Sequence, residues 1–295
     1  MYIIGTDEAG YGPNLGPLVV TATLWEMFDF NFSSFTSAAA GGGIEIGDSK
    51  KLYHSGGSLA KLSKGVLAAL ASINIFPKTD SELFEVIGRT QQLPLTFAGQ
   101  ELSLQKISNE IKPDANLNFP SNSFRAVKSN IIFPAEYNAL INEYGSKGEL
   151  LSNITLKLVV NLINGLGAKL SEPVLVLCDK HGGRNRYADL LATFFQDELI
   201  NEKKQSREIS IYNLKNTEFR FIAKGESQIP IALASMFSKY ARELLMLRFN
   251  LFWKTHIPNI KPTAGYPEDA KRFLKEIEHA LQKLKIDKNE IWRIK

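Results

Sequence analysis

The 295-residue sequence contains one cysteine, Cys178, and only four histidines. A single cysteine excludes a disulfide within the chain, and no paired Cys or Cys/His spacing indicates a zinc site. This composition favours a reducing compartment, so we expect a cytoplasmic protein. The sequence opens directly into the apolar run 2–4, without the basic region or the small-residue cleavage site of a secretion signal, and no apolar run reaches the roughly 18 residues of a membrane-spanning helix. We therefore expect neither secretion nor a membrane anchor.

The sequence also lacks a strong excess of either charge sign. Its 35 Lys and Arg residues against 31 Asp and Glu residues give a formal net charge of +4. This excess is compatible with a polyanionic partner and equally with an ordinary protein. Hydrophobic residues make up 44% of the chain, which excludes a wholly disordered protein and suits one elaborated domain or two small ones.

The apolar pattern predicts strands alternating with helices, which is typical of an α/β domain. Two β-branched segments, 2–6 and 18–25, are separated by a glycine-rich turn and predict a hairpin. Further strands are predicted at 173–178 and 219–223. Helical spacing predicts the helices 59–73, 153–170, 186–201, 230–252 and 267–284.

Two segments carry no clear periodicity. Residues 32–43 are rich in small side chains and low in charge, so we predict a flexible surface loop. Residues 77–148 have a mixed pattern that fits either an inserted subdomain or an extra edge hairpin.

Acidic residues follow two of the predicted strands. Asp7 and Glu8 come after the first strand, and Asp179 comes after the strand 173–178. Adjacent side chains of a regular strand point to opposite faces, so Asp7 and Glu8 reach one site only if the strand bends or ends there. Carboxylates at strand ends of an α/β sheet are typical of binding sites, and without His or Cys they favour Mg²⁺ or Mn²⁺. Each acidic segment taken alone is more typical of a solvated strand end.

The residues beside these acids have simpler interpretations. We expect Cys178 to be a small core residue and His181 to be a loop residue, neither a nucleophile nor a ligand. The spacing Gly10-x-Gly12-x-x-x-Gly16 mimics a dinucleotide-binding loop, but a proline and a second strand follow where that loop requires a helix. A nucleotide-dependent oxidoreductase is therefore disfavoured.

Two basic segments are candidates for phosphate contacts. Residues 47–52, GDSKKL, place adjacent lysines and a hydroxyl after the predicted loop, which suits either phosphate oxygens or an exposed charged turn. Ser235, Lys239 and Arg242 share one face of a predicted helix. That face either lies along a phosphodiester backbone or is the solvated side of the helix.

Five segments in collinear order resemble ribonuclease HII, the type 2 ribonuclease H family. They are DEAGYGPNLGPLVV at 7–20, GDSKKL at 47–52, VLVLCDKHGG at 174–183, KGESQIPIALASMFSKYARELLM at 224–246, and TAGYP at 263–267. Together they frame most of the chain and leave the region near 77–148 uncovered. Five blocks in order are far more specific than any one of them.

The resemblance implies a fold, a division into parts and an activity. The fold would be an RNase H-like mixed β-sheet flanked by helices, with a catalytic domain at 1–250, an insertion at about 77–148 and a C-terminal helical extension at 251–295 that contributes to substrate binding. The activity would be endonucleolytic hydrolysis of the RNA strand of RNA/DNA hybrids, or of ribonucleotides embedded in duplex DNA. We expect nucleic acid as the partner and a monomeric protein.

The resemblance also implies site residues. Two divalent cations, Mg²⁺ or Mn²⁺, would be held by the catalytic carboxylates Asp7, Glu8, Asp179 and Glu226. The backbone of Gly10, Tyr11 and Gly12 would contact the ribose 2′-hydroxyl, which separates RNA from DNA. Substrate contacts to the sugar and phosphates would come from Tyr266, Lys50, Ser235 and Lys239.

Three departures from the family pattern leave alternatives open. Tyr11 stands where the family has arginine, Glu226 stands where it has aspartate, and a longer segment with the charged run 202–207 separates Asp179 from Glu226. That run either covers the substrate channel or decorates the surface. The alternatives are a catalytically weak or inactive nucleic-acid-binding homologue, and a nuclease with an altered substrate. Asp48 and Asp189 are expected at the surface rather than at a metal.

Overall fold

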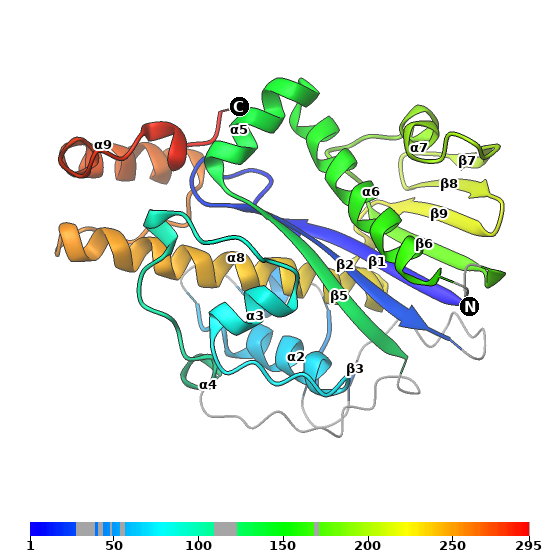
Figure 1. Ribbon diagram of the computed structural model, residues 1–295, viewed down its shortest axis with the longest axis horizontal. Helices are drawn as coiled ribbons and strands as arrows, with labels where there is room; N and C mark the ends of the chain where they lie inside the picture. Colours follow the sequence, from blue (N-terminus) through cyan, green and yellow to red (C-terminus); the bar gives the residue numbers. More distant parts are fainter. Residues whose placement is uncertain are drawn as a thin grey trace.

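The computed structural model describes residues 1–27, 39–40, 44–47, 49–53, 57–108, 123–167 and 171–294 (Figure 1). Its elements are, in chain order, β1 (Tyr2–Ala9), β2 (Leu18–Glu26), β3 (Ala39–Ala40), β4 (Ile44–Glu45), α1 (Ser49–Leu52), α2 (Ala60–Ala71), α3 (Asp80–Val86), η2 (Leu95–Phe97), α4 (Leu104–Ile107), β5 (Phe124–Ile132), α5 (Pro134–Tyr144), α6 (Lys147–Gly165), β6 (Val174–Asp179), α7 (Ala188–Phe194), β7 (Asn201–Gln205), β8 (Ile209–Leu214), β9 (Thr217–Ile222), η5 (Gly225–Ser227), α8 (Ile229–His256), α9 (Pro267–Leu284) and η6 (Lys288–Glu290). In this described part of the chain, no helix combines the length and the apolar character needed to span a bilayer.

A mixed seven-stranded sheet with the order β5-β2-β1-β6-β9-β8-β7 runs through the molecule. β1 pairs antiparallel with β2 and parallel with β6, and β6 pairs parallel with β9. The three parallel strands therefore end at one edge of the sheet, which is where the acidic residues of β1 and β6 lie. The predicted α/β class, with a mixed sheet flanked by helices, is confirmed.

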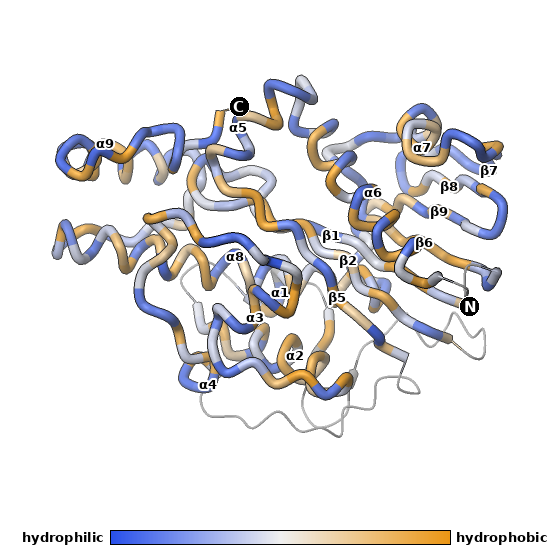
Figure 2. Tube along the Cα trace, in the orientation of Figure 1, coloured by the Kyte–Doolittle hydropathy of each residue, from blue (hydrophilic) through white to orange (hydrophobic). Residues whose placement is uncertain are grey.

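Helices cover both faces of the sheet. Alternate residues of β1 enter different buried clusters: Ile4 packs in the cluster that contains α6, and Ile3 packs in the cluster that contains α2 and α8. Figure 1 shows α6 over one face and α8 over the other. Figure 2 shows hydrophobic and hydrophilic residues alternating along α9, as expected for a helix with one buried face.

A glycine in β1 sets the position of α8. A Cβ atom at Gly5 would lie 2.2 Å from the carbonyl carbon of Pro230, so only glycine allows this approach. The hydroxyl of Thr23 on β2 donates to the Pro230 carbonyl oxygen at 2.9 Å. The first turn of α8 is thereby fixed on β1 and β2, and the following turns lie beside the acidic end of β1.

Most of the strongly periodic elements are confirmed. The predicted hairpin is β1 and β2, the predicted strands 173–178 and 219–223 are β6 and β9, and the predicted helices 59–73, 230–252 and 267–284 are α2, α8 and α9. The helix predicted at 153–170 belongs to α6, which starts earlier, at Lys147, and ends at Gly165. Ser146 explains the earlier start, because its side chain accepts from the Glu149 N–H as an N-cap.

The prediction of a helix at 186–201 was wrong for the residues after 194. α7 covers only Ala188–Phe194, because Phe195 leaves the helical region at φ −129° and ψ 59°. Asn201 begins β7, which pairs with β8. Every residue of β7 is exposed, so its sequence NEKKQ carries no apolar alternation that could predict a strand. The charged run 202–207 lies largely in this edge strand.

The described part of the segment 77–148 contributes directly to the main sheet. Its strand β5 pairs antiparallel with β2 at the edge of the sheet, as a single strand rather than a hairpin. Of the predicted loop 32–43, only Ala39 and Ala40 lie within the described residues, and they pair with β4. The division at 250/251 stays a prediction, although α8 runs through this position and Phe249 lies 5.7 Å from Phe273 of α9, between ring centroids.

Candidate active site

Asp7 and Glu8 lie within β1, which continues through them to Ala9. The predicted strand 2–6 was therefore too short: Asp7 pairs with Thr21 and Glu8 with Val20 in regular register. Asp7 is 8% exposed, whereas Glu8 is partly exposed. The Glu8 N–H donates to Asp7 Oδ1 at 2.8 Å, which turns the Asp7 carboxylate toward its neighbour.

Asp179 is the last residue of β6, as predicted. Its Oδ1 accepts from the Gly225 N–H at 2.8 Å, so the turn between β9 and α8 lies against this carboxylate. Lys224 precedes the turn in the left-handed conformation at φ 58°, and Glu226 follows Gly225 in the one-turn helix η5. Glu226 therefore directly follows the residue whose N–H binds the Asp179 carboxylate.

Asp7 experiences the charges of its acidic neighbours. Burial raises the pKa of Asp7 well above its usual range, and the charges of Glu8 and Asp179 raise this pKa further. A hydrogen bond with the Ser235 side chain acts in the opposite direction. Asp7 therefore interacts electrostatically with both Glu8 and Asp179, and we call these three residues, which lie where the paired strands β1 and β6 end, the acidic cluster.

The chemistry of this cluster fits a hard divalent cation, because its donors are carboxylate oxygens and a cation would offset their mutual repulsion. As the side chains stand, no three His, Cys, Asp or Glu residues in the described ranges are arranged to hold a metal ion. Glu226 is a further candidate carboxylate, because it directly follows Gly225, whose N–H binds Asp179.

The N-terminal half of α8 supplies hydroxyl and amine groups beside Asp7. Ser235 Oγ lies 3.0 Å from Ser49 Oγ, and Ser238 Oγ lies 3.1 Å from the Asp7 carbonyl oxygen. Lys239 forms an ion pair with Glu243 at 3.0 Å. Asp48 and the side chain of Lys50 lie outside the described residues.

Arg242 does not belong to a solvated or substrate-lining face. It is 1% exposed, and its Nη2 donates to the Ala264 carbonyl oxygen at 2.9 Å. The face of Ser235, Lys239 and Arg242 was predicted either to line a phosphodiester backbone or to be solvated. Both alternatives are wrong for Arg242, because its side chain packs under Gly10 in the turn at residues 10–12.

That turn, residues 10–12, follows β1 directly. Gly10 has φ 91°, and the carbonyl oxygens of Gly10 and Tyr11 accept from Arg293 at 2.6 Å and 3.1 Å. The Tyr11 hydroxyl packs close to Gly182, since a Cβ there would lie 2.5 Å from it. Burial raises the pKa of Tyr11, and the charge of Glu8 adds to this effect, so the ring lies near the acidic cluster.

The loop at 263–266 packs against residues 14 and 15, which follow this turn. The Gly265 carbonyl oxygen accepts from the Asn14 and Leu15 N–H groups at 2.8 Å and 3.2 Å. Tyr266 follows with 49% of its surface exposed. Tyr266 therefore follows a loop that is hydrogen-bonded to the segment just after the turn 10–12.

The remaining sequence candidates have mixed outcomes. Cys178 is fully buried, as expected for a core residue. His181 lies in the loop after β6, as expected, and within that loop it is buried, with Nδ1 3.0 Å from Ser152 Oγ. Asp189 is exposed in the first turn of α7, as expected.

Sequence reasoning missed Ser238, Glu243 and Arg293. Glu243 follows Lys239 by four residues on a helix, and this spacing alone predicts an ion pair. Ser238 and Arg293 carry no comparable signal, because their contacts with Asp7 and with the glycine turn join distant parts of the sequence.

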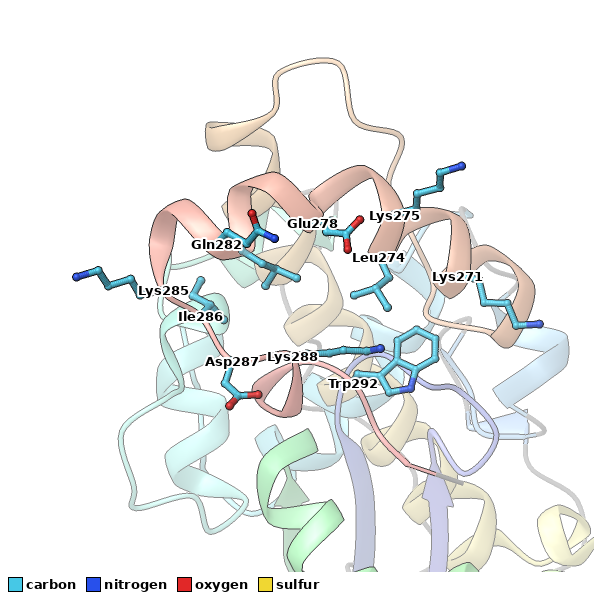
Figure 3. Close-up of a pocket in the computed structure, with 11 residues that line it drawn as sticks. Lys271, Leu274, Lys275, Glu278, Gln282, Lys285, Ile286, Asp287, Lys288 and Trp292 are labelled. Carbon is cyan, nitrogen blue, oxygen red and sulfur yellow. The ribbon is translucent and has the colours of Figure 1, made fainter.

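A separate cavity of about 760 Å³ lies between α9 and the segment that follows it (Figure 3). Its lining includes Leu274 and Trp292 and is rimmed by lysines of α9 and of the segment after it. All of its lining residues belong to 271–292, so it is distinct from the acidic cluster.

Comparison with solved structures relates this architecture to known proteins. RNase HII of Archaeoglobus fulgidus, in its complex with PCNA, aligns over 100% of this chain and 95% of its own, with TM-score 0.50 and 14% identity. Bst-RNase HIII in complex with Mn²⁺ aligns over 100% of this chain and 66% of its own, with TM-score 0.44 and 13% identity. Ribonuclease H2 of Pyrococcus horikoshii OT3 aligns over 99% and 92%, with TM-score 0.42 and 15% identity.

Comparison at the level of sequence found no matching protein-family model and no matching curated protein. The identities above are low enough that structural likeness establishes the fold alone. On that basis, the chain has the fold of the type 2 ribonucleases H, in agreement with the resemblance of its five sequence segments.

Proposed function

We propose that this protein is a metal-dependent endonuclease that hydrolyses the RNA strand of RNA/DNA hybrids or ribonucleotides embedded in duplex DNA. The observation that carries the proposal is the buried Asp7 carboxylate beside Glu8 and Asp179, directly before the turn 10–12. Burying like charges together lowers the stability of a protein, and a bound cation would offset their repulsion. Such groups are therefore typical of functional sites.

In this proposal the carboxylates of Asp7, Glu8, Asp179 and Glu226 hold one or two Mg²⁺ or Mn²⁺ ions. The bound cations would activate a water molecule and stabilise the leaving oxygen of a phosphodiester. Ser235 orients the Asp7 carboxylate through its hydrogen bond. Lys239 would contact a phosphate, with Glu243 holding its amine in place.

Ribonucleotide recognition would come from the turn 10–12 and from Tyr266. A Cβ atom at Gly12 would meet no atom within 4 Å among the described residues, so this position is open to a substrate. The exposed Tyr266 ring lies on the loop that is bonded to Asn14 and Leu15, just after this turn, and would contact the sugar. The ribose 2′-hydroxyl is the group that such a site can use to distinguish RNA from DNA.

The test is cleavage of three labelled duplexes in Mg²⁺ and in Mn²⁺: an RNA/DNA hybrid, DNA with one ribonucleotide, and all-DNA. We expect cleavage only of the two ribonucleotide-containing duplexes. Asp7→Asn should lower kcat roughly 100-fold or more. The matched control is Asp189→Asn, which removes an exposed acid from α7 and should leave kcat unchanged.

Two results would contradict the proposal. Cleavage that survives Asp7→Asn would remove the acidic cluster from the chemistry. Salt-dependent binding without metal-dependent cleavage would instead indicate a non-catalytic nucleic-acid-binding protein, and Glu226→Asp would then be the first variant to test for restored cleavage.

A further inference from the structure

The turn 10–12 accepts hydrogen bonds from a buried arginine, Arg293. Arg293 is 1% exposed, and its two terminal nitrogens donate to consecutive carbonyl oxygens of the turn, Nη1 to Gly10 at 2.6 Å and Nη2 to Tyr11 at 3.1 Å. A planar guanidinium that binds two adjacent carbonyls fixes the orientation of both peptide groups.

The backbone around Arg293 is held on two sides. Its N–H donates to the Asn14 carbonyl oxygen at 2.8 Å, and Asn14 Nδ2 donates back to the Arg293 carbonyl oxygen at 3.2 Å. On the other side, Asn138 of α5 accepts from the Ile294 N–H and donates to the Trp292 carbonyl oxygen, both at 2.8 Å. Arg293 therefore cannot shift independently of the turn.

The neighbouring Trp292 faces a different environment. Figure 3 shows its ring lining the cavity under α9, beside Leu274. The guanidinium of Arg293 instead stacks on the Tyr137 ring of α5, 4.2 Å from its centroid. The Trp292 ring and the Arg293 guanidinium therefore anchor the segment in two directions.

Stability does not account for a cation at this position. In the described part of the chain, the hydrogen-bond partners of the Arg293 guanidinium are carbonyl oxygens rather than a carboxylate, and its Nε has no partner. Burial lowers its pKa to about 10, and the nearby charge of Arg242 acts in the same direction. A buried cation without a paired anion costs stability, so its position calls for another explanation.

The consequence for the turn follows from peptide geometry. In a planar trans peptide, the carbonyl oxygen and the N–H of the next residue point in opposite directions. Because the Gly10 and Tyr11 carbonyls point to Arg293, the N–H groups of Tyr11 and Gly12 point away from it. Neither N–H has an acceptor among the described residues, and Gly12 is exposed.

We infer that Arg293 is a positioning residue, which turns the Tyr11 and Gly12 N–H groups outward as a pair of donors for a ribonucleotide. The inference rests on the proposed function, and it identifies the residue that orients the peptide groups of the turn 10–12. Arg293 touches no substrate itself. It acts through the two carbonyl groups, and its positive charge behind the turn strengthens the field that a polyanion meets.

The test compares Arg293→Met and Arg293→Lys with Lys288→Met, which removes an exposed cation from the same segment. For each protein, Kd is measured without divalent cations for a DNA duplex with one ribonucleotide and for the matched all-DNA duplex. Amide NMR signals of Tyr11 and Gly12 are followed in the same samples, and KM and kcat are measured with Mn²⁺.

We expect Arg293→Met to weaken binding of the ribonucleotide duplex about tenfold, with Kd for all-DNA changed less than twofold. KM should rise by a similar factor while kcat changes little, and both amide signals should shift. Arg293→Lys keeps the charge but not the bidentate geometry, so it should restore only part of the preference. Lys288→Met should behave as wild type.

Three outcomes would overturn the inference. One is an unchanged preference for the ribonucleotide duplex in Arg293→Met. Another is equal weakening for both duplexes, which would indicate a general structural role; if Arg293→Met does not fold, Arg293→Lys decides between these results. A wild-type protein that does not distinguish the two duplexes would overturn the proposed function together with this inference, whereas the first two outcomes leave the proposed function intact.

Discussion

The two glycines of the turn have different reasons to be glycine. At Gly10, a Cβ atom would lie 2.5 Å from the Pro17 carbonyl oxygen and 2.7 Å from Arg242 Nε, and the backbone has φ 91°. At Gly12, a Cβ atom would meet nothing within 4 Å in the described part of the chain. The fold therefore requires glycine at position 10, whereas a requirement at position 12 would come from a bound molecule.

This contrast gives a paired prediction. Gly12→Ala should leave the thermal midpoint unchanged and raise KM for ribonucleotide-containing duplexes about tenfold, because a methyl group would stand between the turn and the sugar. Gly10→Ala should lower the free energy of unfolding by roughly 1–3 kcal/mol, because it is strained in this conformation. Thermal unfolding and steady-state cleavage check both variants. Wild-type KM in Gly12→Ala would show that substrate does not approach this turn.

At the scale of elements, α8 connects the site to the rest of the fold. Its N-terminal half lies beside Asp7, and further along Arg248 forms a buried ion pair with Asp80, the first residue of α3. Arg248 also donates to the Ser81 hydroxyl at 2.8 Å. The helix α3 is thus attached to α8 by charge as well as by apolar packing.

We predict that Arg248→Met lowers the free energy of unfolding by roughly 3–5 kcal/mol, because the Asp80 carboxylate would be left buried without its partner. Lys271→Met is the control, since Lys271 and Glu268 form an ion pair on the exposed surface of α9. That variant should unfold at the wild-type denaturant concentration. Urea unfolding compares them, and equal midpoints would show that the buried pair contributes nothing.

The edge strand β7 is a second element with a testable property. Its residues are all exposed, and in the described ranges no strand pairs with its outer edge. Charged residues on such an edge oppose pairing with another molecule. Lys203→Val together with Lys204→Val should therefore increase aggregation, seen as concentration-dependent light scattering, with little change in the unfolding midpoint. The same double change at Lys271 and Lys275 of α9 is the control, because a helix offers no backbone edge.

Elements with strong periodicity could be predicted from the sequence, and others could not. The strands β1, β2, β6 and β9 and the helices α2, α8 and α9 have continuous or periodic apolar residues. β7 has no such pattern, and β5 lies in a segment whose mixed composition fitted two alternatives. Their pairing with β8 and β2 is decided by contacts with strands already in the sheet, which a local pattern does not contain.

At the scale of the whole molecule, the sheet order decides which acids meet. The sequence pattern placed Asp7 and Asp179 at strand ends, but only the parallel pairing of β1 with β6 brings them to one edge. Arg293 could not be predicted, because it reaches Gly10 across nearly the whole chain. Contacts of this kind depend on the completed fold.

The acidic cluster predicts how the whole protein responds to divalent cations. Mn²⁺ should raise the thermal midpoint of the wild-type protein, with a gain that grows with the logarithm of its concentration above Kd. Asp7→Asn should abolish this gain and, without metal, should unfold at a higher temperature than wild type, because burial and the charges of Glu8 and Asp179 oppose ionisation of Asp7. A wild-type midpoint that does not respond to Mn²⁺ would contradict cation binding at the cluster.

The position of β1 inside the sheet, between β2 and β6, also limits the order in which the chain can fold. β1 and β2 are neighbours in the sequence and can form a hairpin early, but the next strand on the other side of β1 is β6, where Tyr2 pairs with Val174. The helix that buries one face of this hairpin, α8, begins only at Ile229. Closing such long loops slows folding. The residues from β1 through α8 must therefore have left the ribosome before β1 can be enclosed.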